Sequence, residues 1–98
     1  MRFEGSVAAS HPSLPGHFPG QPIVPGVVLL AKVERELAAR LRVEAVEWPQ
    51  VKFLSPLRPE QRYTVEIECA REGLVRFRID HGHTAIASGT LRTQPSQR

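Results

Sequence analysis

A segment dense in proline and glycine separates a short N-terminal stretch from a long apolar one. Residues 12–26 hold five of the nine prolines and three of the seven glycines of the chain, with His17 near the middle. Because each proline fixes φ and removes a backbone donor, this segment cannot form a central strand, yet its fixed dihedrals make it stiff. We expect a stiff loop that holds His17 beside the start of a helix, where an imidazole and free N–H groups provide acid–base and oxyanion chemistry.

The pattern from Val27 to Leu41 predicts one long helix. Its apolar stripe consists of Leu30, Val33, Leu37 and Leu41. The first turn is apolar on all sides, which is typical of a helix end that is buried on every side. We therefore expect a central helix whose N-terminal turn meets the rest of the fold or a partner subunit.

The remaining segments read as β-strands joined mostly by hairpins. The strands are expected at about residues 3–9, 43–54, 62–69, 75–80 and 84–92, followed by a frayed polar tail at 93–98. Pro49 places a bulge or a sheet edge within the second of them. Alternation places Cys69 on an apolar strand face, as a small core residue. The order predicts an α+β fold in which one helix lies across a mainly antiparallel sheet.

Composition narrows the class of protein. The 98 residues, 41% of them hydrophobic, fit a single domain over residues 1–98, and so small a core favours dimerisation. The net charge of +3 is scattered, which argues against nucleic-acid binding but suits an acidic protein partner. Because Cys69 is the only cysteine, and neither a signal-peptide core nor a membrane-spanning stretch is present, we expect a cytoplasmic protein.

Several side chains have plain structural interpretations. His11 is expected to be solvated or to cap a local turn, and His81 and His83 flank a hairpin glycine with no clustered carboxylate or cysteine, so no metal site is expected. Trp48 and Phe53 are expected to be packing groups, or to line a tunnel for an acyl chain.

The chain resembles a known family over nearly its whole length. Gly16-His17-Phe18-Pro19-Gly20-Gln21-Pro22-Ile23-Val24-Pro25-Gly26-Val27 is similar to the Gly-His-Phe-Pro-x-x-Pro-x-x-Pro-Gly-Val signature of the bacterial (3R)-3-hydroxyacyl-ACP dehydratases. Val51 to Pro59 resembles the family's Arg-Phe-x-x-Pro-Val-x-Pro-Gly segment, and Arg71 to Phe77 its first late hairpin. The resemblance implies the hot-dog fold, in which a sheet wraps one long helix.

The same resemblance implies a reaction and a site. The family eliminates water from a 3-hydroxyacyl thioester on acyl carrier protein, without a cofactor, as a homodimer or higher oligomer. His17 matches the histidine that removes the α-proton. Gly26 and Val27 match the region whose N–H groups polarise the thioester carbonyl, and Phe18 and Pro25 complete the expected substrate-binding set.

In the family, a carboxylate from the other subunit's helix assists departure of the 3-hydroxyl, and this helix carboxylate is missing here. Relatives carry Glu or Asp six residues after the proline that precedes the helix, a position that Ala31 occupies, and Arg35 stands where Gln is common. Glu34 lies one turn further along and either replaces the acid or pairs with an arginine at the dimer seam.

Three functions are therefore left open. The first is a dehydratase of fatty-acid or polyene-type synthesis, acting on acyl carrier protein or CoA thioesters, with surface arginines such as Arg58, Arg62 or Arg35 meeting the acidic carrier. The second is a non-catalytic acyl-binding or heterodimer subunit, for which the absent carboxylate is expected. The third is an acyl-thioester hydrolase, which also generally needs a helix carboxylate.

Overall fold

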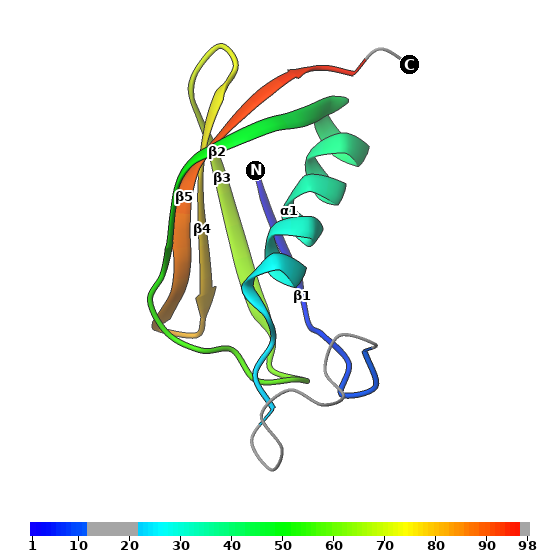
Figure 1. Cartoon of the computed structure of the whole chain (residues 1–98), viewed down its shortest axis with the longest axis vertical. Helices are drawn as coiled ribbons and strands as arrows, with labels where there is room; N and C mark the ends of the chain where they lie inside the picture. The colour runs from blue at the N-terminus through cyan, green and yellow to red at the C-terminus, as the bar shows by residue number, and fades with distance from the viewer. Residues whose placement is uncertain (12–21, 97–98) are drawn as a thin grey trace.

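The computed structural model describes residues 1–11 and 22–96; residues 12–21, which include His17 and Phe18, and residues 97–98 lie outside the described part. The described elements are β1 (Arg2–Gly5), α1 (Gly26–Leu41), β2 (Val43–Phe53), β3 (Tyr63–Arg71), β4 (Leu74–His81) and β5 (Thr84–Pro95). The strands form one antiparallel sheet in the order β1-β3-β4-β5-β2, and α1 lies along one face of it (Figure 1). The α+β prediction is confirmed.

The helix turns a different apolar stripe toward the sheet than expected. Its buried residues are Leu29, Val33 and Leu37. Leu30 is half-buried and packs against the edge of the core, whereas Leu41 is 44% exposed, so the C-terminal end of the predicted stripe is wrong. The expected burial of the first turn on every side is also wrong for the single chain, because Val27 is 73% exposed. In a turn where every residue is apolar, hydrophobicity alone does not fix the rotation of the helix.

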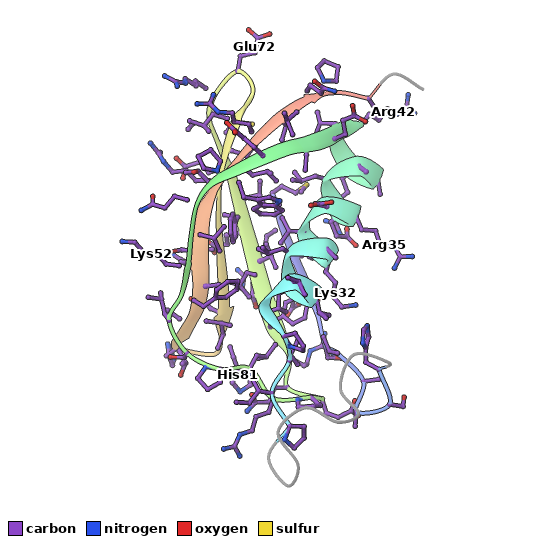
Figure 2. The ribbon with its side chains drawn as sticks, viewed as in Figure 1. Lys32, Arg35, Arg42, Lys52, Glu72 and His81 are labelled. Carbon is purple, nitrogen blue, oxygen red and sulfur yellow. The ribbon has the colours of Figure 1, made fainter. Side chains whose placement is uncertain are left out.

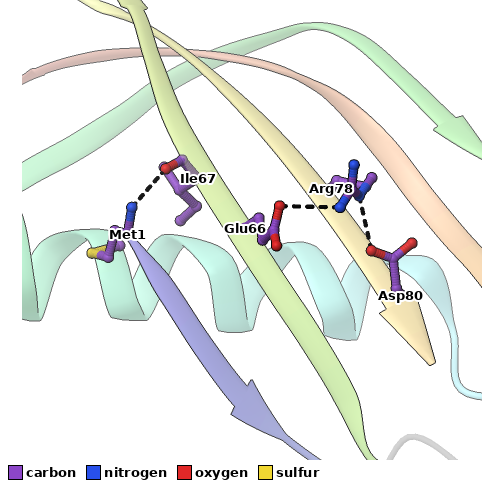
Figure 3. A network of polar contacts seen from close by, with 5 residues as sticks. All are labelled: Met1, Glu66, Ile67, Arg78 and Asp80. Carbon is purple, nitrogen blue, oxygen red and sulfur yellow. Dashed lines mark hydrogen bonds and ion pairs between the residues drawn. The ribbon is translucent and has the colours of Figure 1, made fainter. Parts of the chain in front are cut away.

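Alternation along β3 and β4 is confirmed, with one exception. The side chains that face the core are Tyr63, Val65 and Ile67 on β3 and Val75, Phe77 and Ile79 on β4. Cys69 is exposed, contrary to the prediction that it is a core residue. The pairing of β1 with β3 ends near Ile67, whose carbonyl accepts a 2.8 Å hydrogen bond from the Met1 ammonium group (Figure 3). Within the described chain, β3 runs on past β1 toward Cys69 without a neighbour on that side.

The largest differences from the expected strand boundaries are at two places. β1 ends at Gly5 rather than near residue 9, and β5 continues to Pro95 where a frayed tail was expected. The extension of β5 pairs with the start of β2, with Val43 opposite Pro95. The irregularity predicted at Pro49 is confirmed, because the register of β2 shifts between Glu47 and Gln50 and β2 is an edge strand.

Arg40 ties the far end of α1 to β1. Its Nε forms a 2.7 Å ion pair with Glu36, its Nη1 donates to the carbonyl of Arg2 at 3.2 Å, and its guanidinium lies 5.4 Å from the centre of the Phe3 ring. Nearby, burial and then the negative charge of Glu36 raise the pKa of Tyr63. These contacts hold the N-terminal strand against the helix.

The outer face of the sheet is polar. Arg78 on β4 bridges Glu66 at 3.0 Å and Asp80 at 2.8 Å (Figure 3). The hydrogen bond with Asp80, followed by the charges of Asp80 and Glu66, raises the pKa of Arg78. The apolar side chains therefore gather between helix and sheet.

Candidate active site

Among the described residues, no side chain caps the N–H groups of the first turn of α1. Pro25 is the N-cap residue, with φ −60° and ψ 141°, and offers no side-chain hydrogen bond. Val28 donates its N–H to the carbonyl of Pro25 at 3.0 Å, and the turn contains no acidic residue. The N–H groups of Gly26 and Val27 thus lie at the positive end of the helix dipole without an internal carboxylate.

An apolar hollow of about 360 Å³ opens on the sheet side of this turn. It is lined by Ile23, Val24, Pro25, Gly26, Leu29, Phe53, Leu54, Ser55, Pro56, Leu57 and Ile86. Backbone hydrogen bonds fix its walls, since Val24 donates to the carbonyl of Leu57 and Leu54 to that of Ile86, both at 2.8 Å. Such a hollow fits an apolar chain better than a charged group, because Ser55 has the only polar side chain among the described lining residues.

Phe53 lies directly over the helix start. A Cβ built on Gly26 would stand 2.5 Å from Cε1 of the Phe53 ring, so only glycine lets the ring sit there. Phe53 and its neighbour Leu54 are each 55% exposed in the single chain. The sequence interpretation of Phe53 as a possible tunnel residue agrees with its place in the hollow, whereas Trp48 does not line the hollow.

Glu34 lies away from the helix start. It follows Gly26 by eight residues, which corresponds to about 12 Å along the helix axis. Its side chain is exposed, and its Oε1 accepts a 3.2 Å hydrogen bond from Nε1 of Trp48. The Trp48 ring in turn meets Phe77 edge-on, with ring centres 5.4 Å apart. The Glu34 side chain therefore points toward Trp48 on β2 and does not line the hollow that contains Pro25 and Gly26.

A second hollow, also of about 360 Å³, lies on another side of the same helix turn. Its lining consists of His11, Val27, Val28, Ala31, Lys32 and Arg35. Val27 is thus separated from the apolar hollow that holds Pro25 and Gly26. Sequence reasoning missed this hollow, although the spacing of Val28, Lys32 and Arg35 places them on adjacent helix turns.

The histidines of the hairpin are placed as the sequence suggests. Nδ1 of His81 lies 2.6 Å from the carbonyl oxygen of Arg62, to which it donates. Within residues 1–11 and 22–96, no three His, Cys, Asp or Glu side chains gather as metal ligands would. In the same described part, no helix combines the length and the hydrophobicity needed to cross a bilayer.

Comparison with solved structures shows the fold. The chain is similar to a protein of the dehydratase heterocomplex ApeI:P from Xenorhabdus doucetiae, with a TM-score of 0.82 and 23% identity over 94% of this chain and 84% of that one. It is also similar to an uncharacterized protein from Erwinia carotovora subsp. atroseptica, with a TM-score of 0.81 and 22% identity over 99% of this chain and 84% of that one. A probable thioesterase from Bartonella henselae is similar with a TM-score of 0.69 and 16% identity, over 97% of this chain and 90% of that one. The expected hot-dog fold is confirmed.

Comparison with family models gives a more specific result. No curated protein has a significantly similar sequence. The model of the ApeI-like family, described as ApeI dehydratase, matches residues 1–90. The resemblance to hot-dog dehydratases seen in the sequence is confirmed by this match, and the chain belongs to the ApeI-like dehydratase family.

Proposed function

We propose that this chain eliminates water from a 3-hydroxyacyl thioester, in fatty-acid or polyene-type synthesis. The apolar hollow beside an uncapped helix N-terminus is the observation that most supports this function. An acyl chain would occupy the hollow, and the thioester carbonyl would accept hydrogen bonds from the N–H groups of Gly26 and Val27. The helix dipole would stabilise the negative charge that develops on that oxygen.

His17 is the proposed base. Its neutral imidazole accepts the α-proton, and the electron pair of the broken C–H bond forms the new Cα–Cβ double bond. The bond from Cβ to the 3-hydroxyl oxygen breaks, and this oxygen leaves with a proton as water. The elimination is redox-neutral and requires no cofactor, but the leaving hydroxyl needs an acid.

The group that protonates the leaving hydroxyl is not assigned by the residues of a single chain. Ala31 stands at the position of the family carboxylate, and Glu34 lies about 12 Å along the axis from the helix start of its own chain. Glu34 could therefore act only on a site of a second subunit, after leaving the indole of Trp48. If it does not, the acid comes from a homologous partner that carries the carboxylate.

The second candidate function follows from that alternative: a heterodimer subunit that contributes His17 and the acyl hollow to a composite site. This function is favoured because position 31 holds alanine in place of the family carboxylate. The similar structure from Xenorhabdus doucetiae is also part of a dehydratase heterocomplex. The catalytic centre formed by the partner's histidine and this chain's Ala31 would then be inactive.

The surface of the chain supports association in either case. β2 is an edge strand, and Val46 and Phe53 on it are each 55% exposed in the single chain. An open strand edge with apolar side chains favours pairing with a second hot-dog subunit, either a copy or a homologue. The exposed Arg58, next to Leu57 of the hollow, and Arg62 are suited to an acidic carrier protein. With its single cysteine, the protein fits a reducing, cytoplasmic setting.

The test is turnover of a 3-hydroxyacyl thioester, followed as enoyl product. Wild type is compared with His17→Ala, Glu34→Gln and the matched control Glu36→Gln, whose carboxylate is paired with Arg40. The proposal predicts that His17→Ala abolishes enoyl formation and that Glu36→Gln leaves it unchanged. Loss of activity in Glu34→Gln assigns the acid to Glu34.

Other outcomes separate the alternatives. Turnover only after a homologous subunit is added supports the heterodimer. Release of free acid without enoyl product refutes the dehydratase in favour of a hydrolase. Full activity of His17→Ala removes the proposed base.

A further inference from the structure

The hollow formed by His11, Val27, Val28, Ala31, Lys32 and Arg35 combines an apolar floor with a cationic rim. Val27 and Ala31 are exposed and Val28 is half-buried, so aliphatic surface is open to solvent between two basic side chains. Figure 2 shows Lys32 and Arg35 extending from the helix on the side away from the sheet. We refer to these six residues as the cationic hollow.

The positive charges of the cationic hollow are not neutralised within the described residues. Neither Lys32 nor Arg35 takes part in an ion pair there. Glu36, four residues after Lys32, turns instead to Arg40 at 2.7 Å. Glu34, beside Arg35 in sequence, accepts its hydrogen bond from Trp48 on β2. Both nearby carboxylates are thus occupied elsewhere.

The arrangement also has an energetic cost that a ligand would relieve. Lys32 and Arg35 are like charges three residues apart on one helix, a spacing at which side chains meet and repel. An anion between them would remove the repulsion and gain charge-assisted hydrogen bonds.

We propose that the cationic hollow binds the phosphate ester of the pantetheine arm that carries the substrate. This rests on the proposed function, which makes the substrate a thioester of acyl carrier protein or CoA; both arms end in the same phosphate ester. Arg35 lies about 13 Å along the helix axis from the Gly26 N–H. The phosphate contacts Lys32 and Arg35 while the neutral part of the arm runs over Val27, Val28 and Ala31 toward the helix start.

Equilibrium binding tests the proposal without any need for turnover. Isothermal titration calorimetry compares pantetheine, 4′-phosphopantetheine, CoA and inorganic phosphate on the full chain. We expect 4′-phosphopantetheine and CoA to bind at least about ten-fold more tightly than pantetheine, as one or two charge-assisted contacts would give. The doubly substituted Lys32→Gln, Arg35→Gln variant should lose this difference and retain the affinity for pantetheine.

Lys52→Gln is the matched control, because Lys52 lies on β2 and extends from the opposite side of the molecule (Figure 2). Circular dichroism establishes that each variant is folded. The proposal is overturned if phosphate adds no affinity, if Lys52→Gln removes the same affinity, or if inorganic phosphate binds as tightly as 4′-phosphopantetheine. If the phosphate adds affinity but the protein does not dehydrate a 3-hydroxyacyl thioester, only the proposed function is refuted. If the protein dehydrates the thioester but the phosphate adds no affinity, only this inference is refuted.

Discussion

Replacing Gly89 with alanine should separate the edge strand β2 from β5. A Cβ at this position would lie deep inside van der Waals contact with the carbonyl oxygen of Gln50 and 2.9 Å from Cε1 of Phe77. The phenyl ring can turn, but the carbonyl belongs to the β2 backbone. β2 therefore has to move outward by roughly 1 Å, which lengthens the ladder contacts around the Val51–Gly89 pair.

The magnitude follows from two contributions. Overpacking of this kind costs about 1–3 kcal/mol, and each weakened ladder hydrogen bond about 0.5–1.5 kcal/mol. Because β2 is an edge strand of the single chain, it can yield, so the total free energy of unfolding should fall by about 2–4 kcal/mol. For a domain of this size, that corresponds to a decrease in Tm of about 10–25 °C.

Urea and thermal unfolding followed by circular dichroism measure the loss. Gly82→Ala is the control, since Gly82 has φ 59° and no atom lies within 4 Å of the place that a Cβ would take, so only backbone strain of about 1 kcal/mol is added. If Gly89→Ala is as stable as wild type, or loses no more than Gly82→Ala, the close contact between the β2 and β5 backbones is wrong.

Three further changes probe separate parts of the molecule. Trp48→Phe removes the donor to Glu34 but keeps a ring beside Phe77, so urea unfolding should show a loss below about 1 kcal/mol; a loss equal to that of Trp48→Ala would contradict this. The pKa of Tyr63 is raised in the folded chain, so its contribution to stability is complete below its ordinary pKa of 10.0 and is lost as pH rises through the higher folded value. Tyr63→Phe should therefore flatten the decline of stability at alkaline pH, and an unchanged decline would exclude Tyr63 as its source. Ala31→Glu places a carboxylate four residues before Arg35 and should lower the affinity for 4′-phosphopantetheine about ten-fold in the same titration; an unchanged affinity would argue against the cationic hollow.

The sequence predicted the order and kind of every described element, because each segment had a clear period. It failed where neighbouring structure decides. Leu29 and Leu30 are equivalent in an apolar turn, and contacts with distant residues, such as that of Gly26 with the Phe53 ring, decide the rotation of the helix. The alternation along β3 places Cys69 on the same face as the core residues. Cys69 is nevertheless exposed, because it lies beyond the end of β1, and no local sequence pattern indicates where β1 ends.

The sequence predicted the helix start of the candidate site but not the apolar hollow beside it. The proline and glycine pattern identified the helix start at Gly26, and the structure adds the apolar hollow against it, whose walls come from Phe53, Leu57 and Ile86, far along the chain. Periodicity places residues on faces of one element, but it does not indicate which loop closes over a helix end. Such hollows arise from contacts between distant segments.

The two departures from the family pattern, Ala31 and Arg35, look independent in the sequence but are one change in the structure. They are four residues apart on α1 and line the same cationic hollow. A carboxylate at position 31 would stand in the favourable orientation to pair with a base at position 35. Here the negative charge is absent and a positive charge is added beside Lys32, so the hollow changes from one that could supply an acid to one that attracts an anion. If this helix no longer donates a proton, the same surface is available to hold the charged end of the substrate carrier, and the acid has to come from elsewhere in the assembly.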